Sequence, residues 1–286
     1  MPFWNIETEK QFFRDALRMS SPESLFYNLS LGQFAYVPQK QDAEGQTLQS
    51  RNSLIGSFTE RWAKNLFEPL ARKHNLFAVN GVQCDAIGLP RGSKADLAFC
   101  TTNDTIQSPE NIKLVFEIKM SIVSNYRFQA PNSIEWVGDY KSHKGQPSLL
   151  RSDSMLKAIG KSINIRVSSV ESATIPIIIL GNSPITQGYV HKVDFLKTSG
   201  VVQGFWSLHP NPIPSDFVVA TDGGGFQTIS NLTMLEKVIT PLLANDMNYF
   251  SSMVTKRKLG EIIRIASSEP TDTAKAEKFL SLIRSL

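Results

Sequence analysis

The chain has 286 residues, of which 41% are hydrophobic and 20% are charged. This ordinary globular composition, with 17 glycines and 15 prolines, excludes a collagen, a coiled coil, a disordered tail protein and a disulfide-stapled miniprotein. Lysine and arginine outnumber aspartate and glutamate by 30 to 26, and the net charge of +4 permits a polyanionic partner without requiring one.

The cysteines and the first residues of the chain indicate where the protein works. Cys84 and Cys100 form no CxxC pair and have no histidines clustered beside them, so we expect neither a zinc ribbon nor a disulfide framework. Two lone thiols suit a reducing compartment. The first ten residues carry acids where a secretory signal needs bases, and the apolar run Ile175–Leu180 is too short to span a bilayer. These features predict a soluble cytoplasmic protein without a membrane partner.

The first part of the chain is expected to be helical and irregular. We expect a helix over Thr8–Met19 and an exposed loop over Pro38–Gln49. The strongest helical pattern begins near Asn52 or Ser53, which are suitable N-caps. Apolar residues then recur every four positions, at Leu54, Phe58, Trp62, Leu66 and Leu70. Because this apolar face must be buried, the helix is predicted to pack on a sheet.

Three strand-like runs follow, with a polar connection between the second and the third. The predicted strands are Leu76–Val82, Ala95–Thr101 and Lys113–Ile118, and the connection is 103–111. Residues 120–150 mix aromatic and basic side chains without clear periodicity, which favours a loop.

The remainder of the chain combines helices with further strands. A helix is expected over Ser152–Ser168, with Leu156, Ile159, Ile163 and Val167 on its apolar face and Lys157, Lys161 and Asn164 on its polar face. Ile175–Leu180 is expected to be a buried strand. Further strands are predicted at Gly188–Phe195, Val201–Leu208 and Phe217–Ala220, the last after a proline-rich turn at 209–214, and further helices at Leu232–Leu243, Lys256–Ser267 and Ala274–Leu286. This order predicts an α/β fold with a mixed central β-sheet flanked by helices.

Two acids and a lysine on neighbouring strands form the constellation that suggests catalysis. Side chains alternate along a strand, so Glu117 and Lys119 point the same way, and Asp96 reaches them if the two strands are neighbours. Converging carboxylates repel each other unless a cation lies between them, and Mg²⁺ accepts one or two carboxylates and several waters. A metal, a water and a lysine at one place are what phosphodiester hydrolysis requires.

Other interpretations of the same residue types stay open. Most Glu-x-Lys triplets are solvated surface charges, but Glu117 and Asp96 both interrupt apolar strands, where an acid is costly. Asp139-Tyr140-Lys141 has the same form in a loop-like context and is the rival candidate. His143 is expected to be a solvated loop histidine or a contact to a base or phosphate. Gly223–Gly225 lacks the spacing of a phosphate-binding loop and is expected to be a turn.

Asp96, followed about twenty residues later by Glu117-Ile118-Lys119, resembles the PD-(D/E)xK nuclease superfamily, and within it a type II restriction endonuclease most of all. The resemblance covers roughly residues 52–180, and Ala95 stands where the family name has proline. It implies a restriction-endonuclease-like core with insertions and Mg²⁺-dependent DNA cleavage. By position, it implies Asp96 and Glu117 as metal ligands and Lys119 as the catalytic lysine.

The resemblance also suggests an extra acid on the preceding helix. Glu60 is the only well-placed candidate there, although helical phase puts it well off the face that Phe58 and Trp62 mark.

Positive charge is concentrated beside the candidate residues. Across 113–166, nine lysines and arginines stand against four acids, so this stretch holds the excess charge of the chain. The predicted loop 120–150 is the candidate for groove contacts, and the stripe of Lys157, Lys161 and Asn164 for contacts to the DNA backbone. The residues expected to bind DNA are Arg127, Lys141, Lys144, Arg151, Lys157 and Lys161.

These features together predict a sequence-specific, Mg²⁺-dependent endonuclease of duplex DNA. We expect one domain over 1–286, with a nuclease core at about 52–180 and elaborations at 1–51 and 181–286 for DNA recognition or dimerisation. A homodimer is expected because cutting both strands needs two active sites, and a companion DNA methyltransferase because a prokaryotic host must protect its own sites. Two alternatives remain open: a structure-specific repair or recombination nuclease, and a non-catalytic DNA-binding protein whose acids are structural.

Overall fold

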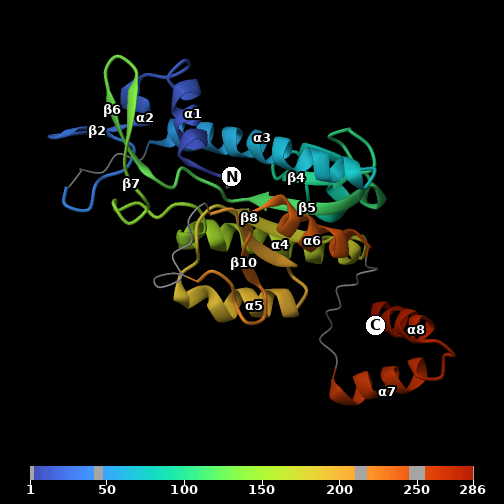
Figure 1. Cartoon of the computed structure of the whole chain (residues 1–286). Coiled ribbons are helices and arrows are strands. Elements are labelled where there is room, and N and C mark those ends of the chain that lie inside the picture. The colour runs from blue at the N-terminus through green and yellow to red at the C-terminus, as the bar shows by residue number, and fades with distance from the viewer. Residues whose placement is uncertain (1–2, 42–47, 210–217, 245–254, 286) are drawn as a thin grey trace. The chain divides into compact units, whose positions relative to one another are not determined.

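The computed structural model describes residues 3–41, 48–209, 218–244 and 255–285. The chain divides into two compact units, Met1–Met247 and Asn248–Leu286 (Figure 1). One domain is predicted over 1–286, whereas the structure separates the last 39 residues as a unit of their own. The core predicted between 52 and 180 lies entirely within the first unit.

A mixed six-stranded sheet forms the centre of the first unit, as predicted. Its strand order is β10-β9-β8-β5-β4-β3. The strands are β3 (Phe77–Val82), β4 (Ala95–Cys100), β5 (Ile112–Ile118), β8 (Ile177–Gly181), β9 (Gly204–Ser207) and β10 (Phe226–Thr228). The first three pair antiparallel, and β8, β9 and β10 continue the sheet in parallel. The return from β5 to β8 runs through a helix, as a parallel connection requires.

Helices cover both faces of this sheet (Figure 1). One face packs on α3 (Gln49–Lys73) and α6 (Leu232–Ala244), and α1 (Ile6–Ala16) joins the same core through its contacts with α3. The other face packs on α4 (Ser152–Ser168) and α5 (Val190–Thr198). Cys84 and Cys100 are free thiols buried in the second of these cores. No helix of the described residues is long and apolar enough to cross a membrane.

The face of α3 that is most deeply buried lies one residue further along the chain than the predicted apolar face. The residues that turn fully inward are Ile55, Thr59, Ala63 and Phe67. The predicted residues Phe58, Trp62 and Leu66 are half-buried beside them. Glu60, next to the buried Thr59, is half-buried on α3.

The prediction of a loop over 120–150 is also wrong, because this segment contains a β-hairpin. Strands β6 (Asn125–Gln129) and β7 (Ser133–Gly138) pair with each other, and β6 pairs with β2 (Gly32–Phe34), which in turn pairs with β1 (Tyr27–Leu29). Tyr126 and Phe128 are buried and Arg127 lies between them on the other face, which is the alternation of a half-buried strand.

Other predicted elements differ more locally from the structure. Gly188–Phe195 is not a strand: it spans the end of the 3₁₀ turn Gln187–Tyr189 and most of α5. Val218 and Ala220 form isolated bridges instead of a strand, and Phe217 lies outside the described residues. The predicted loop at 38–49 and the turn at 209–214 fall partly outside them, and α3 begins at Gln49. The helices α2 (Pro22–Leu25), α7 (Lys256–Ala266) and α8 (Asp272–Arg284) complete the fold, and α7 and α8 pack together in the second unit.

A buried glutamate links the N-terminal helix α1 to the four-stranded sheet β1-β2-β6-β7. Glu9 of α1 is 1% exposed, and it accepts hydrogen bonds from Trp4 Nε1 (2.7 Å) and Tyr126 Oη (2.8 Å). The backbone N–H groups of Val123 and Ser124 also donate to it, at 2.5 and 3.1 Å. Burial raises the pKa of Glu9, and these four donors oppose that rise by favouring the carboxylate.

Replacing Glu9 with alanine is therefore expected to destabilise the first unit by about 3 kcal/mol or more, because it leaves buried donors without an acceptor. Urea unfolding followed by tryptophan fluorescence measures this cost. The matched control is Glu7→Ala on the same helix, whose side chain is 70% exposed and pairs only with Lys10 and Arg14; its cost is expected to stay below about 0.5 kcal/mol. Equal costs for the two variants would refute this role for Glu9.

Candidate active site

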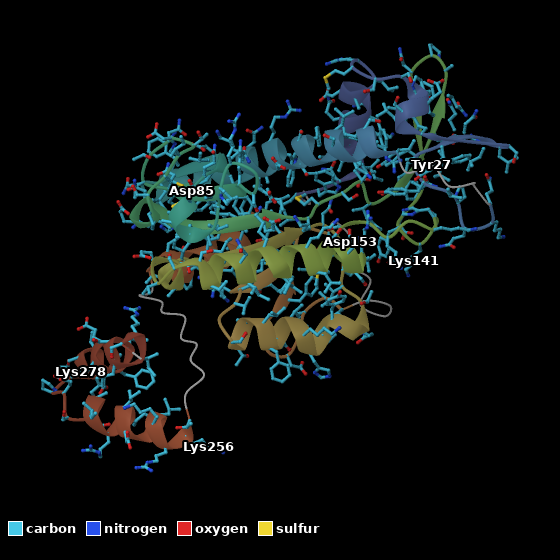
Figure 2. The ribbon with its side chains drawn as sticks, turned by 180° about the vertical axis from the view of Figure 1, so that it is seen from behind. Tyr27, Asp85, Lys141, Asp153, Lys256 and Lys278 are labelled. Carbon is cyan, nitrogen blue, oxygen red and sulfur yellow. The ribbon has the colours of Figure 1, made fainter. Side chains whose placement is uncertain are left out.

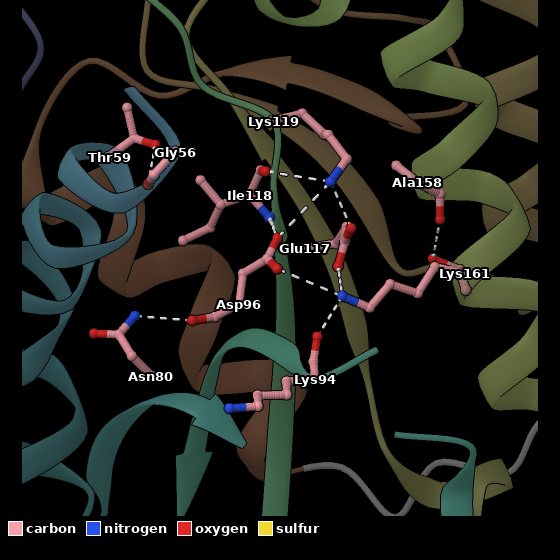
Figure 3. Close-up of polar contacts among 11 residues, drawn as sticks. Gly56, Thr59, Asn80, Lys94, Asp96, Glu117, Ile118, Lys119, Ala158 and Lys161 are labelled. Atoms are coloured by element: carbon pink, nitrogen blue, oxygen red, sulfur yellow. Dashed lines mark hydrogen bonds and ion pairs between the residues drawn. The ribbon is translucent and has the colours of Figure 1, made fainter. Parts of the chain in front are cut away.

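The pairing of β4 with β5 brings the two predicted acids together. Leu97 pairs with Phe116 in this antiparallel ladder, so one step further Asp96 lies opposite Glu117. Asp96 Oδ2 accepts a hydrogen bond of 2.7 Å from the backbone N–H of Ile118 (Figure 3). The side chain of Asn80 donates to the carbonyl oxygens of Asp96 (2.8 Å) and Glu60 (3.2 Å), which joins β3, β4 and α3 at this end of the sheet.

Lys119 follows the last residue of β5 and meets both acids. Its backbone N–H donates to the carbonyl oxygen of Leu180 (2.7 Å), which extends the parallel pairing with β8 by one residue. Its Nζ lies 2.5 Å from Glu117 Oε1 and 3.8 Å from Asp96 Oδ2 (Figure 3). The three residues predicted from the motif therefore converge at one point, at the carboxyl end of a parallel strand pair.

A fourth residue, Lys161 of α4, enters the same cluster. Its Nζ lies 2.6 Å from Glu117 Oε2 and 3.4 Å from Asp96 Oδ1, and it also donates to the carbonyl oxygen of Lys94 (Figure 3). The sequence analysis places Lys161 on an outward polar stripe beside Lys157. The structure instead directs it into the acidic pair and leaves only 15% of its side chain exposed, so it is not part of an open backbone-binding surface.

The reason for this difference is that α4 packs on the sheet through a face that the sequence pattern did not indicate. Its buried residues are Met155, Ala158, Ser162, Ile165 and Arg166. Leu156, Ile163 and Val167, predicted to be the packed face, are 62%, 43% and 74% exposed. Small side chains let α4 lie close to the sheet, and Lys161, next to Ser162, then reaches the carboxylates.

The charges of the cluster balance, and their burial shifts the pKa values of its members. Burial, together with the Asp96 carboxylate, raises the pKa of Glu117, and the two lysines counteract the rise. Burial alone would lower the pKa of Lys161, but Asp96 and Glu117 outweigh it and raise that pKa. Burial and then Asp96 also raise the pKa of Glu60, which puts this acid within electrostatic reach of the cluster.

The donor set fits a divalent cation of the Mg²⁺ type. Among the described residues, no group of three or more His, Cys, Asp or Glu side chains has metal-binding geometry. Mg²⁺ needs fewer protein ligands than that, since it usually keeps several waters beside one or two carboxylates. The ammonium of Lys161 already bridges the two carboxylates, which shows that a positive charge is accommodated between them.

If a divalent cation shares the carboxylates with Lys161, removing this lysine should tighten metal binding. A unit charge about 4 Å away contributes about 4 kcal/mol at an effective dielectric constant of about 20, and we expect Lys161→Ala to bind Mg²⁺ about tenfold or more tightly than the wild type. Isothermal titration with Mg²⁺ measures the affinity. Lys157→Ala is the control, because that side chain is 72% exposed and its ion pair is with Asp153. Weaker binding by Lys161→Ala would contradict this interpretation.

The other residues predicted to bind DNA lie at the surface, outside the ion-pair cluster of Asp96 and Glu117. Arg127 pairs with Glu135 across the β6–β7 hairpin (2.6 Å), and Arg151 and Lys157 pair with Asp153 at 3.7 and 3.0 Å. Lys141 and Lys144 are exposed in the segment after β7; Figure 2 shows Lys141 and, at the start of α4, Asp153. The rival Asp139 accepts a hydrogen bond from the backbone N–H of Lys141 (2.9 Å) and so closes a turn.

His143 and the segment Gly223–Gly225 have structural roles. His143 is 1% exposed and stacks on Tyr36 with 4.1 Å between ring centroids, so it is neither a solvated histidine nor an accessible base contact. The segment Gly223–Gly225 is a turn, as predicted. It wraps around the carboxylate of Asp194, which accepts the N–H groups of Gly223 (3.0 Å) and Gly225 (2.7 Å), and a Cβ on Gly225 would lie 2.4 Å from the backbone of Val193.

A pocket of about 500 Å³ opens beside Lys119. Its lining includes Arg51 of α3, Arg151 and Ser154 at the start of α4, and Tyr27 of β1. Sequence reasoning missed Arg51, and no local pattern marks it, because its surroundings come from segments distant in the chain. Lys161 does not line this pocket, so Lys119 is the lysine of the cluster that faces it.

No protein-family model matches this chain, and no curated protein or solved structure matches it either.

Proposed function

We propose that this protein is a Mg²⁺-dependent endonuclease that hydrolyses phosphodiester bonds of duplex DNA at specific sequences, as a type II restriction enzyme does. The observation that carries the proposal is the meeting of Asp96, Glu117 and Lys119 within 4 Å at the end of β5. A buried and a half-buried carboxylate, beside a lysine that lines a pocket, combine cation binding with stabilisation of developing negative charge.

In this proposal each side chain has a separate role. Asp96 and Glu117 hold the cation, and the bond from the N–H of Ile118 fixes the orientation of Asp96. A bound Mg²⁺ supplies a Lewis acid for the phosphate and lowers the pKa of a coordinated water. Lys119 donates a hydrogen bond to the phosphate under attack, whose negative charge grows as the new P–O bond forms and the old one breaks. Glu60 of α3 interacts electrostatically with Asp96 and Glu117, so it adds to the negative potential that attracts the cation.

The exposed arginines and lysines support a polyanionic substrate. Arg127, Arg151 and Lys157 retain 38%, 57% and 72% exposure of their side chains, and Lys141 and Lys144 are exposed as well. Each phosphate contact contributes about 0.9 to the salt dependence of binding. We further propose a homodimer, since cutting both strands needs two sites, in the cytoplasm of a prokaryote with a companion methyltransferase.

One observation favours a different function. The two carboxylates are neutralised by two lysines of the same chain, which is also how a structural ion cluster is arranged. In that case the protein would bind DNA without cutting it. A structure-specific repair or recombination nuclease would share the same active site and differ only in its substrate.

Digestion of a plasmid of known sequence, with Mg²⁺ and with EDTA, tests the proposal. Discrete fragments with Mg²⁺ and intact plasmid with EDTA are the expected result. Cleavage of branched or flapped DNA without discrete plasmid fragments would favour the repair nuclease. DNA binding with no metal-dependent nicking of any substrate would refute the enzymatic proposal and leave the structural ion cluster.

A further inference from the structure

The pocket beside Lys119 is lined by cations and contains no acid from the described residues. Its charged lining residues are Arg51, Lys119 and Arg151, and Ser121, Ser148 and Ser154 add hydroxyl groups. A cavity with this lining repels cations and attracts anions. Its volume of about 500 Å³ far exceeds that of a single inorganic ion and lies in the range of small-molecule sites.

Arg51 is a buried cation without a carboxylate partner in the described part of the chain. It is 5% exposed, and its Nη1 donates to the carbonyl oxygens of Leu25 (3.2 Å) and Ala35. Its guanidinium lies over the rings of Tyr27 and Tyr36, at 5.4 and 5.1 Å from their centroids, and its Nε has no hydrogen-bond partner there. Burying a charge is costly unless an opposite charge offsets it, so the site favours an anionic ligand.

The first turn of α4 contributes a second, independent attraction for an anion. Arg151 is the N-cap of this 17-residue helix, and its side chain makes no capping hydrogen bond. The first N–H groups of a helix have no acceptor within the helix and carry a partial positive charge. Ser154, in this first turn, lines the pocket. Within the described residues, Arg151 forms a distant ion pair with Asp153 (3.7 Å), in which both side chains are exposed.

We propose that this pocket binds one nucleotide unit through its phosphate, with the phosphate between Arg51 and the first turn of α4. The inference rests on the proposed function, because it places the nucleotide next to Lys119 and the candidate metal ligands. The ligand chemistry is a phosphate ester on a sugar. It has two possible sources: a nucleotide of the substrate strand next to the cleaved bond, or a free nucleotide.

Binding without a divalent cation separates this proposal from the nuclease proposal. The probe is 2′-deoxyadenosine 5′-monophosphate in EDTA, measured by isothermal titration, with 2′-deoxyadenosine as the control. We expect the nucleotide to bind and the nucleoside to bind at least about tenfold more weakly, since charge-assisted hydrogen bonds to phosphate are the strong ones. Equal binding of both probes, or no binding of the nucleotide, would overturn the proposal.

Variants locate the site. Ser154→Glu adds a negative charge at the first turn of α4 and is expected to weaken nucleotide binding at least about tenfold, and Arg151→Ala about threefold. Lys113→Ala, a charge change at an exposed residue of β5 that does not line the pocket, should bind the nucleotide as the wild type does. Arg51→Met tests the buried cation, with circular dichroism as a check of folding. Unchanged affinity in Ser154→Glu and Arg151→Ala would refute the assignment.

Oligonucleotides distinguish the two sources of the phosphate. A single strand with a 5′-phosphate that competes for the pocket at least about tenfold better than the free nucleotide would assign the pocket to the substrate strand. A free nucleotide that binds as well as the strand would assign it to a nucleotide effector. Both results support a nucleotide phosphate pocket, whereas a strand and a nucleotide that do not compete with each other contradict it.

Discussion

Asp96→Asn is expected to abolish Mg²⁺-dependent cleavage of plasmid DNA while the protein stays folded. Asparagine has the same shape and keeps an oxygen that accepts the N–H of Ile118, which Asp96 accepts at 2.7 Å. It removes one of the two charges that would hold the cation in the proposed function. We expect the cleavage rate to fall at least about 10³-fold, the effect of losing about 4 kcal/mol of transition-state stabilisation.

The rate is measured from the conversion of supercoiled plasmid to nicked and linear forms. Asp104→Asn is the matched control, since Asp104 is an exposed acid in the connection between β4 and β5. That variant should cut at the wild-type rate. Wild-type cleavage by a folded Asp96→Asn protein would remove Asp96 from the active site.

Lys119→Ala is expected to lower the cleavage rate by about 10²–10³-fold with little effect on DNA binding. This is the usual effect of removing one donor aimed at developing negative charge. Lys119 faces the pocket and its side chain is 20% exposed, so its loss does not open a buried core. Single-turnover cleavage measures the rate, and a mobility-shift titration in EDTA measures DNA binding.

Lys113→Ala is the control on the same strand, where the lysine is exposed and donates to the carbonyl oxygen of Glu110. A comparison of Lys119→Ala with Lys161→Ala distinguishes the roles of the two lysines of the cluster. We expect Lys161→Ala to retain far more activity than Lys119→Ala, because Lys161 neutralises the carboxylates without lining the pocket. The reverse order would exchange their roles.

The mixed sheet and the three motif residues followed from local sequence patterns. The apolar runs of β4 and β5, each interrupted by one acid, predicted two neighbouring strands with Asp96 and Glu117 on the same face. The antiparallel register confirms this proximity. Alternation along β5 placed Glu117 and Lys119 together, and this prediction needed no knowledge of distant contacts.

Lys161 and Arg51 show why the rest of the site was not predictable. The direction of Lys161 depends on which face of α4 packs on the sheet, and the helix buries Ala158 and Ser162 while it exposes Leu156. Periodicity identifies an apolar stripe but not the face that a neighbouring element selects. Arg51 is buried because Tyr27 and Tyr36, from other segments, enclose it. The strand predicted over Gly188–Phe195 is likewise mostly the helix α5 in the structure.

The most direct test of the central claim is a Mn²⁺ titration followed by electron paramagnetic resonance. It compares the wild type with the double variant that carries Asp96→Asn and Glu117→Gln. We predict that the wild type binds Mn²⁺, that Mg²⁺ displaces it, and that the double variant has lost this site while its circular dichroism spectrum is unchanged. Equal Mn²⁺ binding by both proteins would contradict the claim that these two carboxylates hold a divalent cation.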